Sequence, residues 1–243
     1  MAEPTIVLFD LDGVVLTQKA LEYTALKQLK NKWYNWQNIE NLRLIDFARM
    51  FEEADSKNRV KALIQVNLAY KSIIPNRFKR LLFFIRFRRS YKKYEKIYEQ
   101  VNPELKSILT KFKNNGIISG IVSNTSRKRI KFYTLKFHLN DYISYFISRD
   151  DVLVRKPHPY PLLFALRKIK EKSDIPRISK KNVYYIGDLT SDIRCAKAAN
   201  VTSIALLSGH GTEKQLRDSK PDYFIKDIRD ILEIEPVKKL LSK

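Results

Sequence analysis

The chain has 243 residues, of which 44% are hydrophobic and 30% are charged. These values are typical of a globular protein with a sizeable core and exclude wholesale disorder. The formal net charge of +21 favours anionic partners, and the single cysteine, Cys195, excludes an intrachain disulfide.

The first predicted element is a strand that ends in a carboxylate. From Thr5 to Asp10 the sequence reads TIVLFD. A continuous apolar run of this kind suits a strand that is buried on both faces of a parallel sheet. An acidic residue precedes any apolar run of signal-peptide length, so we expect a cytoplasmic protein.

The next segment, residues 17–100, is predicted to form several helices. It contains no glycine and one proline, Pro75, and its leucines, tyrosines and basic residues recur at helical spacing. The longest apolar patch, Leu81–Phe87, is interrupted by Arg86 and is much shorter than a membrane span. We therefore expect no membrane-spanning helix.

The most basic part of this segment is Arg77–Lys96. Leu81, Phe84, Ile85 and Arg88 follow helical spacing there, which favours a helix with its aromatic residues in the core and its arginines in solvent. The alternative is that the arginines select a highly anionic substrate or contact a nucleic-acid backbone.

Strands and helices alternate after residue 100. Asn102 and Pro103 predict the start of a helix, and Gly116 predicts its end. Further helices are predicted at residues 127–139, 160–171 and 191–199 and from residue 227. Strands are predicted at residues 117–122, 145–147, 183–186, 202–207 and 223–225.

This order predicts an α/β fold with a mainly parallel sheet. An all-helical insert interrupts the sheet after its first strand. We therefore expect two domains, a core formed by residues 1–16 and 101–243 and a helical domain formed by residues 17–100.

Four polar clusters follow four of the predicted strands. They are DLDG at 10–13, SNT at 123–125, RKPHP at 155–159 and GDLTSD at 187–192. Ligands of open parallel sheets bind outside the carboxyl ends of the strands, so the clusters are expected to converge on one crevice.

The residues in these clusters suit phosphoryl transfer. Asp10 and Asp188 can each offer an oxygen to Mg²⁺, as can the backbone carbonyl of Asp12. Lys156 can balance charge on the phosphoryl oxygens, and the Ser123 hydroxyl can bind one of them. Asp12 can protonate the leaving oxygen and then take a proton from water.

The same four motifs, in the same order, resemble those of the haloacid dehalogenase superfamily, in particular its phosphoglycolate phosphatase-like branch. The resemblance implies a Rossmann-like core, a helical cap in the insert and a Mg²⁺ cofactor. It also implies site roles: Asp10 as nucleophile, Asp12 as acid and base, Ser123, Asn124 and Lys156 as phosphate-binding residues, Asp10, Asp12 and Asp188 as metal ligands, and Asp192 in or near the second shell.

The resulting prediction is a Mg²⁺-dependent phosphatase that hydrolyses a small anionic phosphate monoester through a phospho-aspartate. A phosphomutase of the same superfamily is one alternative. Another is a protein that binds nucleic acid, or removes phosphate from its ends, through the basic insert. His158 and His210 are interpreted as loop residues, and Cys195 as packed core.

Overall fold

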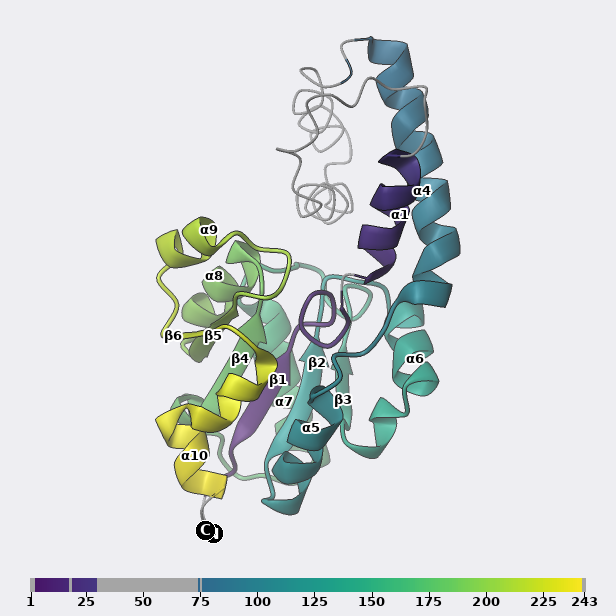
Figure 1. Cartoon of the computed structure of the whole chain (residues 1–243). Helices are drawn as coiled ribbons and strands as arrows, with labels where there is room; N and C mark the ends of the chain where they lie inside the picture. The colour runs from purple at the N-terminus through teal and green to yellow at the C-terminus, as the bar shows by residue number, and fades with distance from the viewer. Residues whose placement is uncertain (1–2, 18, 30–73, 75, 242–243) are drawn as a thin grey trace. The chain divides into compact units, whose positions relative to one another are not determined.

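The structure is a computed structural model of the chain, and it describes residues 3–17, 19–29, 74 and 76–241 (Figure 1). The chain divides into two compact units. We call Met1–Leu16 with Val101–Lys243 the core unit and Thr17–Gln100 the insert unit. Each unit is described separately below.

The core unit contains a six-stranded sheet in which all neighbouring strands are parallel. The strand order is β3-β2-β1-β4-β5-β6, so β1 lies in the interior of the sheet. The strands are β1 (Ile6–Phe9), β2 (Ile118–Val122), β3 (Tyr145–Ile147), β4 (Val183–Gly187), β5 (Thr202–Leu206) and β6 (Tyr223–Ile225). The predicted mainly parallel α/β fold is confirmed.

Helices cover both faces of this sheet (Figure 1). The α-helices of the core unit are α5 (Leu105–Asn114), α6 (Arg127–Lys136), α7 (Tyr160–Lys172), α8 (Thr190–Ala199), α9 (Glu213–Asp218) and α10 (Glu235–Leu241). Short 3₁₀ helices span Leu139–Asp141, Lys180–Asn182 and Ile228–Glu233. This layered arrangement leaves the ends of the strands and their loops to form the site.

Successive side chains of β1 point to opposite faces of the sheet, so they contribute to two separate apolar layers. Val7 and Phe9 pack in a buried cluster with residues of α5 and α10. Ile6 and Leu8 pack in another cluster with residues of α7 and α8. All four side chains are fully buried, which explains why this strand is apolar at every position.

Several predicted elements end at different residues in the structure. Helix α6 ends at Lys136 rather than at Leu139, because the backbone turns left-handed at His138, where φ is 53°. The helix predicted from residue 227 begins as a 3₁₀ helix. Helix α9 was not predicted, since it has only six residues.

The insert unit is helical in the part that the structure describes. It contains α1 (Lys19–Leu29) and α4 (Arg77–Tyr98). The Tyr23 ring of α1 stacks on Tyr98 of α4 at 3.9 Å between centroids and meets Tyr94 edge-on at 4.9 Å. Residues 30–73 of the predicted helical segment lie outside the described residues.

The buried face of α4 differs from the predicted one. Leu81 and Ile85 are 52% and 42% exposed, whereas Phe83 and Phe87 are fully buried. The helix is therefore rotated relative to the expected core face. One arginine is also buried: Arg80 donates a hydrogen bond from Nη1 to the Ile74 carbonyl at 2.5 Å. None of the described helices is both long enough and apolar enough to span a membrane.

Candidate phosphoryl-transfer site

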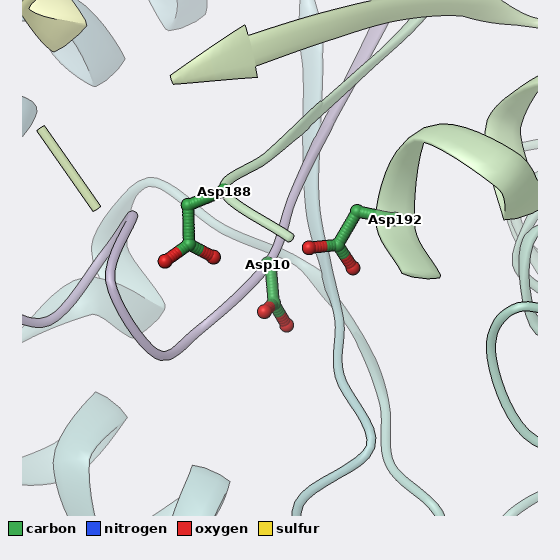
Figure 2. Close-up of side chains that lie close together, drawn as sticks. All are labelled: Asp10, Asp188 and Asp192. Carbon is green, nitrogen blue, oxygen red and sulfur yellow. The ribbon is translucent and has the colours of Figure 1, made fainter. Parts of the chain in front are cut away.

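Three buried carboxylates meet where β1 and β4 end. Asp10 follows β1 and Asp188 follows β4, while Asp192 projects from the first turn of α8 (Figure 2). Strand pairing brings the first two together, because the Asp10 amide donates to the Ile186 carbonyl at 2.9 Å. One carboxylate oxygen from each aspartate lies within 4.8 Å of the other two.

The donor set fits a hard divalent cation. Asp10, Asp188 and Asp192 are all fully buried. Within the part of the chain that the structure describes, Asp188 Oδ1 and both carboxylate oxygens of Asp10 accept no hydrogen bond of regular geometry. Buried carboxylate oxygens of this kind are costly unless a cation compensates them, and Mg²⁺ prefers oxygen ligands. Asp10 and Asp188 are thus the residues best suited to hold the ion.

Burial dominates the proton affinity of two of these carboxyls, those of Asp10 and Asp192. It raises the pKa of Asp10 from 3.8 to about 6, with Lys156 opposing the shift and Asp192 and Asp12 adding to it. Burial also raises the pKa of Asp192, again against the charge of Lys156. Burial and the neighbouring carboxylates act in the same direction, because both disfavour the charged form of a carboxyl.

Lys156 supplies the positive charge on one side of the cluster. Its Nζ lies 2.9 Å from Asp10 Oδ1 and 2.6 Å from Asp192 Oδ1, and its side chain is 2% exposed. The same ammonium donates to the Tyr185 hydroxyl at 2.9 Å. Tyr185 in turn donates to the Val122 carbonyl at 2.8 Å. The lysine is therefore held beside Asp10 by two buried groups, Asp192 of α8 and Tyr185 of β4.

The loop that carries Lys156 is tied to the loop after β2. The Asn124 side chain donates to the Lys156 carbonyl at 3.1 Å and accepts from the Lys156 amide at 3.0 Å. This reciprocal pair occupies the amide group that was expected to bind phosphate. Asn124 thus positions Lys156 through its side chain. Ser123 is buried, and its Oγ accepts from the Thr125 amide at 3.3 Å.

Asp12 lies outside the buried carboxylate cluster and pairs with an arginine. Its Oδ1 and Oδ2 accept hydrogen bonds from Arg129 Nη1 at 2.5 and 2.6 Å. Arg129 was missed by the sequence interpretation. It belongs to a basic run in α6, at a distance of 117 positions from Asp12, and nothing in that run marks it as different from its neighbours.

His210 is a second residue that the sequence interpretation missed. Asp188 Oδ2 accepts from the His210 amide at 2.6 Å and lies 2.9 Å from its Nδ1. Burial opposes protonation of this ring, but the hydrogen bond and charge of Asp188 prevail and raise the pKa of His210 above 6.5. Both contacts engage one oxygen of Asp188, so they orient the other oxygen toward the cluster. In the sequence, the feature that could have identified His210 was its position between Gly209 and Gly211.

Those glycines are required by the close packing around Asp188. A Cβ on Gly209 would lie 2.2 Å from the Asp188 Cβ, and one on Gly211 would lie 2.0 Å from its carbonyl oxygen. A Cβ on Gly13 would lie 1.9 Å from Asp188 Oδ2. Three glycines from two loops thus leave the space that Asp188 occupies.

The aspartates and the lysine expected at the site from sequence separate into two groups. Asp10, Lys156, Asp188 and Asp192 form one buried network of ion pairs and adjacent carboxylates. Asp12 is at the edge of this network, with its side chain 21% exposed. Its backbone carbonyl remains the proposed metal ligand, since its carboxylate is engaged by Arg129.

Comparison with known proteins places the chain in a family. Residues 7–206 match the family described as haloacid dehalogenase-like hydrolase. The pyrophosphatase PpaX of Oceanobacillus iheyensis is 24% identical over 234 residues, which cover 94% of this chain and 95% of that protein. The phosphoglycolate phosphatase of Yersinia pestis is 29% identical over 133 residues, which cover 55% of this chain and 54% of that protein.

Several such alignments are partial. The chain spans between 52% and 61% of the length of four curated relatives that it matches. A crystal structure of a predicted phosphoglycolate phosphatase from Haemophilus somnus 129pt has a TM-score of 0.65 at 23% identity. That comparison covers 97% of this chain and 99% of the other, so it supports the same fold. The chain belongs to the haloacid dehalogenase-like hydrolases, as the four sequence motifs predicted.

Proposed function

We propose that the protein is a Mg²⁺-dependent phosphatase that hydrolyses a small-molecule phosphate monoester through a phospho-aspartate on Asp10. The observation that carries this proposal is the buried cluster of Asp10, Asp188 and Asp192, with Lys156 Nζ 2.9 Å from Asp10. Membership of the hydrolase family supports the same reaction class.

Asp10, Asp188 and the backbone carbonyl of Asp12 would hold the Mg²⁺ ion. When bound, the ion supplies positive charge that offsets repulsion between the anionic phosphate and the carboxylate nucleophile. Lys156 and Ser123 would bind the remaining phosphoryl oxygens, which carry the charge in the transition state. Asp192 and His210 would fix Lys156 and Asp188, respectively, in place.

The two chemical steps would use the two carboxylates of the first loop. Asp10 attacks phosphorus through one oxygen, the bond from phosphorus to the ester oxygen breaks, and Asp12 gives that oxygen a proton. A water molecule then attacks the aspartyl phosphate and transfers its proton to Asp12. The bond from phosphorus to the Asp10 oxygen breaks and free phosphate is released. Asp10 and Asp12 thereby return to their original protonation states.

The domain division is part of the proposal. We infer that residues 1–16 and 101–243 form the catalytic domain and that residues 17–100 act as a cap that selects the substrate, the role that the family resemblance implies. A phosphomutase would use the same Asp10 and Asp12 but pass the phosphoryl group to a sugar hydroxyl. Product analysis in the assay below separates the two reactions.

A second candidate is a phosphatase that acts on nucleic-acid ends. Helix α4 carries eight exposed basic side chains, at positions 77, 79, 86, 88, 89, 92, 93 and 96. Such a helix suits a phosphate backbone. Oligonucleotide affinity that falls steeply with salt would support this candidate, and no binding at low salt would exclude it.

The experiment that tests the main proposal measures phosphate release from a panel of phosphomonoesters, with Mg²⁺ or with chelator. Asp10→Asn is expected to lower kcat by about 10³-fold or more, because the amide cannot act as the nucleophile. Asp218→Asn is the matched control, since Asp218 is exposed on α9. It should retain wild-type activity.

Acid quenching during turnover provides an independent readout. The wild type should carry a phosphoryl group on the peptide that contains Asp10, and Asp10→Asn should carry none. Turnover that continues in Asp10→Asn, or a phosphoryl group on another residue, would refute the assignment of the nucleophile.

A further inference from the structure

Tyr185 reaches the site from the middle of β4, and its side chain is fully buried. The preceding residue, Tyr184, is also buried, but it packs in the apolar cluster on the opposite face of the sheet. Strand positions buried in a parallel sheet are usually apolar, because a buried hydroxyl costs free energy unless it is hydrogen-bonded. The contacts of the Tyr185 hydroxyl therefore indicate what a tyrosine contributes at this position.

The Tyr185 hydroxyl connects two loops of the site. It accepts a hydrogen bond from Lys156 Nζ at 2.9 Å and donates one to the Val122 carbonyl at 2.8 Å. Asp192 Oδ1 lies further away, at 3.3 Å. Val122 directly precedes Ser123, whereas Lys156 lies in the loop after β3. One hydroxyl thus joins the Lys156 ammonium to the backbone of the segment that carries Ser123.

Burial keeps this hydroxyl in its neutral form. It raises the pKa of Tyr185 well above its ordinary value, although the charge of Lys156 opposes the shift. A neutral hydroxyl has one proton to donate and lone pairs that accept. Because its proton is directed at the Val122 carbonyl, a lone pair faces the ammonium. Tyr185 can therefore orient Lys156 without neutralising its charge.

The Lys156 ammonium is oriented by two regular hydrogen bonds. One runs to the Tyr185 hydroxyl and the other to Asp192 Oδ1 at 2.6 Å. Asp10 Oδ1 lies 2.9 Å from the same nitrogen, but among the described residues it accepts no hydrogen bond of regular geometry. The three N–H bonds of an ammonium have fixed directions relative to one another. The two partners together therefore set how its charge faces the nucleophile.

We propose that Tyr185 is a positioning residue for phosphoryl transfer, whose hydroxyl sets the direction of the Lys156 ammonium and its spacing from Ser123. The inference rests on the proposed function, because Lys156 and Ser123 meet phosphoryl oxygens only if the site transfers that group. Phenylalanine at this position would keep the ring but remove one partner of the ammonium and the donor to the Val122 carbonyl. The charge would stay in the site but would be misdirected, which costs most in the transition state.

The test compares Tyr185→Phe with Tyr184→Phe as the matched control. Each substitution removes one buried hydroxyl from β4, but only the first removes a contact of Lys156. For the phosphomonoester that the wild type prefers, Tyr185→Phe should lower kcat by about tenfold or more and change KM by less than roughly threefold. Tyr184→Phe should leave both constants within roughly twofold of the wild type. Thermal unfolding establishes that each variant is folded at the assay temperature, where a loss of stability alone would not lower kcat.

Binding without turnover provides a second readout. Calorimetry measures the affinity for Mg²⁺ alone and then for inorganic vanadate, which can adopt the five-coordinate geometry of a phosphoryl group in transfer, with excess Mg²⁺. Tyr185→Phe should weaken vanadate binding by about tenfold and leave Mg²⁺ binding within roughly twofold, because Asp10 and Asp188 keep their positions. Unchanged vanadate binding, an equal loss in Tyr184→Phe, or an equal loss of Mg²⁺ binding would overturn the inference.

The outcomes separate this inference from the proposed function. If the wild type hydrolyses esters through Asp10 but Tyr185→Phe keeps the wild-type kcat and vanadate affinity, the inference fails and the phosphatase assignment stands. If vanadate binding depends on Tyr185 as described but the wild type hydrolyses no ester, the positioning role stands and the phosphatase assignment fails.

Discussion

Asp10 is a carboxyl group whose surroundings resist its ionisation. It is fully buried among Asp188 and Asp192, and its pKa is raised to about 6. The folded state therefore binds the Asp10 proton more tightly than the unfolded chain does. This tighter proton binding stabilises the folded state fully below pH 3.8, the ordinary pKa of the carboxyl. The stabilisation is lost as the pH rises through the folded-state pKa of about 6.

The first prediction concerns stability against pH in the presence of chelator. Asp10→Asn removes the buried charge, so at pH 7 it should raise the free energy of unfolding by roughly 1 to 3 kcal/mol. The gain should shrink as the pH is lowered toward about 4.5, where the wild-type carboxyl is already protonated. Urea denaturation at several pH values measures it, and a variant less stable than the wild type at pH 7 would contradict the electrostatic account.

The second prediction concerns His210 as a positioning residue for Asp188. His210→Ala removes the ring that lies 2.9 Å from Asp188 Oδ2. Loss of such an outer contact typically weakens metal binding by about 10- to 100-fold, so the Mg²⁺ concentration for half-maximal activity should rise by that factor. Calorimetry with Mg²⁺ provides a measurement that does not require turnover.

His138→Ala is the control for this variant. His138 is exposed and lies outside the site, so its replacement removes an imidazole without removing a contact of Asp188. It should leave the Mg²⁺ requirement unchanged. If His138→Ala and His210→Ala raised the requirement equally, loss of stability rather than loss of the Asp188 contact would be the cause.

At the scale of elements, the turn after β1 determines whether the metal site can form. Gly13 has a φ of 77°, and a Cβ there would overlap Asp188 Oδ2 at 1.9 Å. Gly116, which follows α5, has a φ of 69°, but a Cβ added there would meet nothing within 4 Å among the described residues. The two glycines therefore share a left-handed backbone conformation, but only Gly13 of the two lies against the site.

The third prediction uses this pair. Gly116→Ala should lower the free energy of unfolding by about 1 kcal/mol and keep full activity, because only backbone strain is added. Gly13→Ala should also displace Asp188 and lower kcat/KM by about 10²-fold or more. Urea denaturation and phosphate release measure the two effects. Equal activity in the two variants would show that Asp188 tolerates displacement.

At the scale of the whole molecule, the core unit holds together the two points where the insert unit begins and ends. Leu16 pairs with Val101 in an antiparallel bridge, and the Asn102 amide donates to the Val15 carbonyl at 2.9 Å. The core unit also has its own buried apolar clusters on both faces of the sheet. It therefore meets the physical requirements of an independent domain.

The fourth prediction follows from this arrangement. A deletion variant that joins Leu16 to Val101 through a short glycine-serine linker should unfold in one cooperative transition and retain Mg²⁺ binding. It should hydrolyse small esters with reduced selectivity, because the proposed cap is absent. Thermal unfolding and calorimetry test the first part. A variant that lacks a cooperative transition would show that residues 17–100 belong to the same folding unit.

The buried strands and the residues directly after them could be predicted from sequence. The run IVLF of β1 is apolar at every position because both faces of the strand are buried, and that pattern needs no knowledge of neighbours. Asp10 and Asp188 were identified because they follow such strands. The predicted inward side of α4 was wrong, since the residues of this helix are apolar or aromatic on more than one side.

The sequence by itself determined the parallel α/β core, the helical insert and the acidic and basic residues that gather at the carboxyl ends of the strands, because local patterns of burial and turn formation encode all three. Only the tertiary structure decided which partners those residues have. Arg129 meets Asp12, His210 meets Asp188, and Tyr185 meets Lys156 across 117, 22 and 29 positions. The physical reason is that such pairings depend on strand order and loop packing, which leave no periodic trace in the chain.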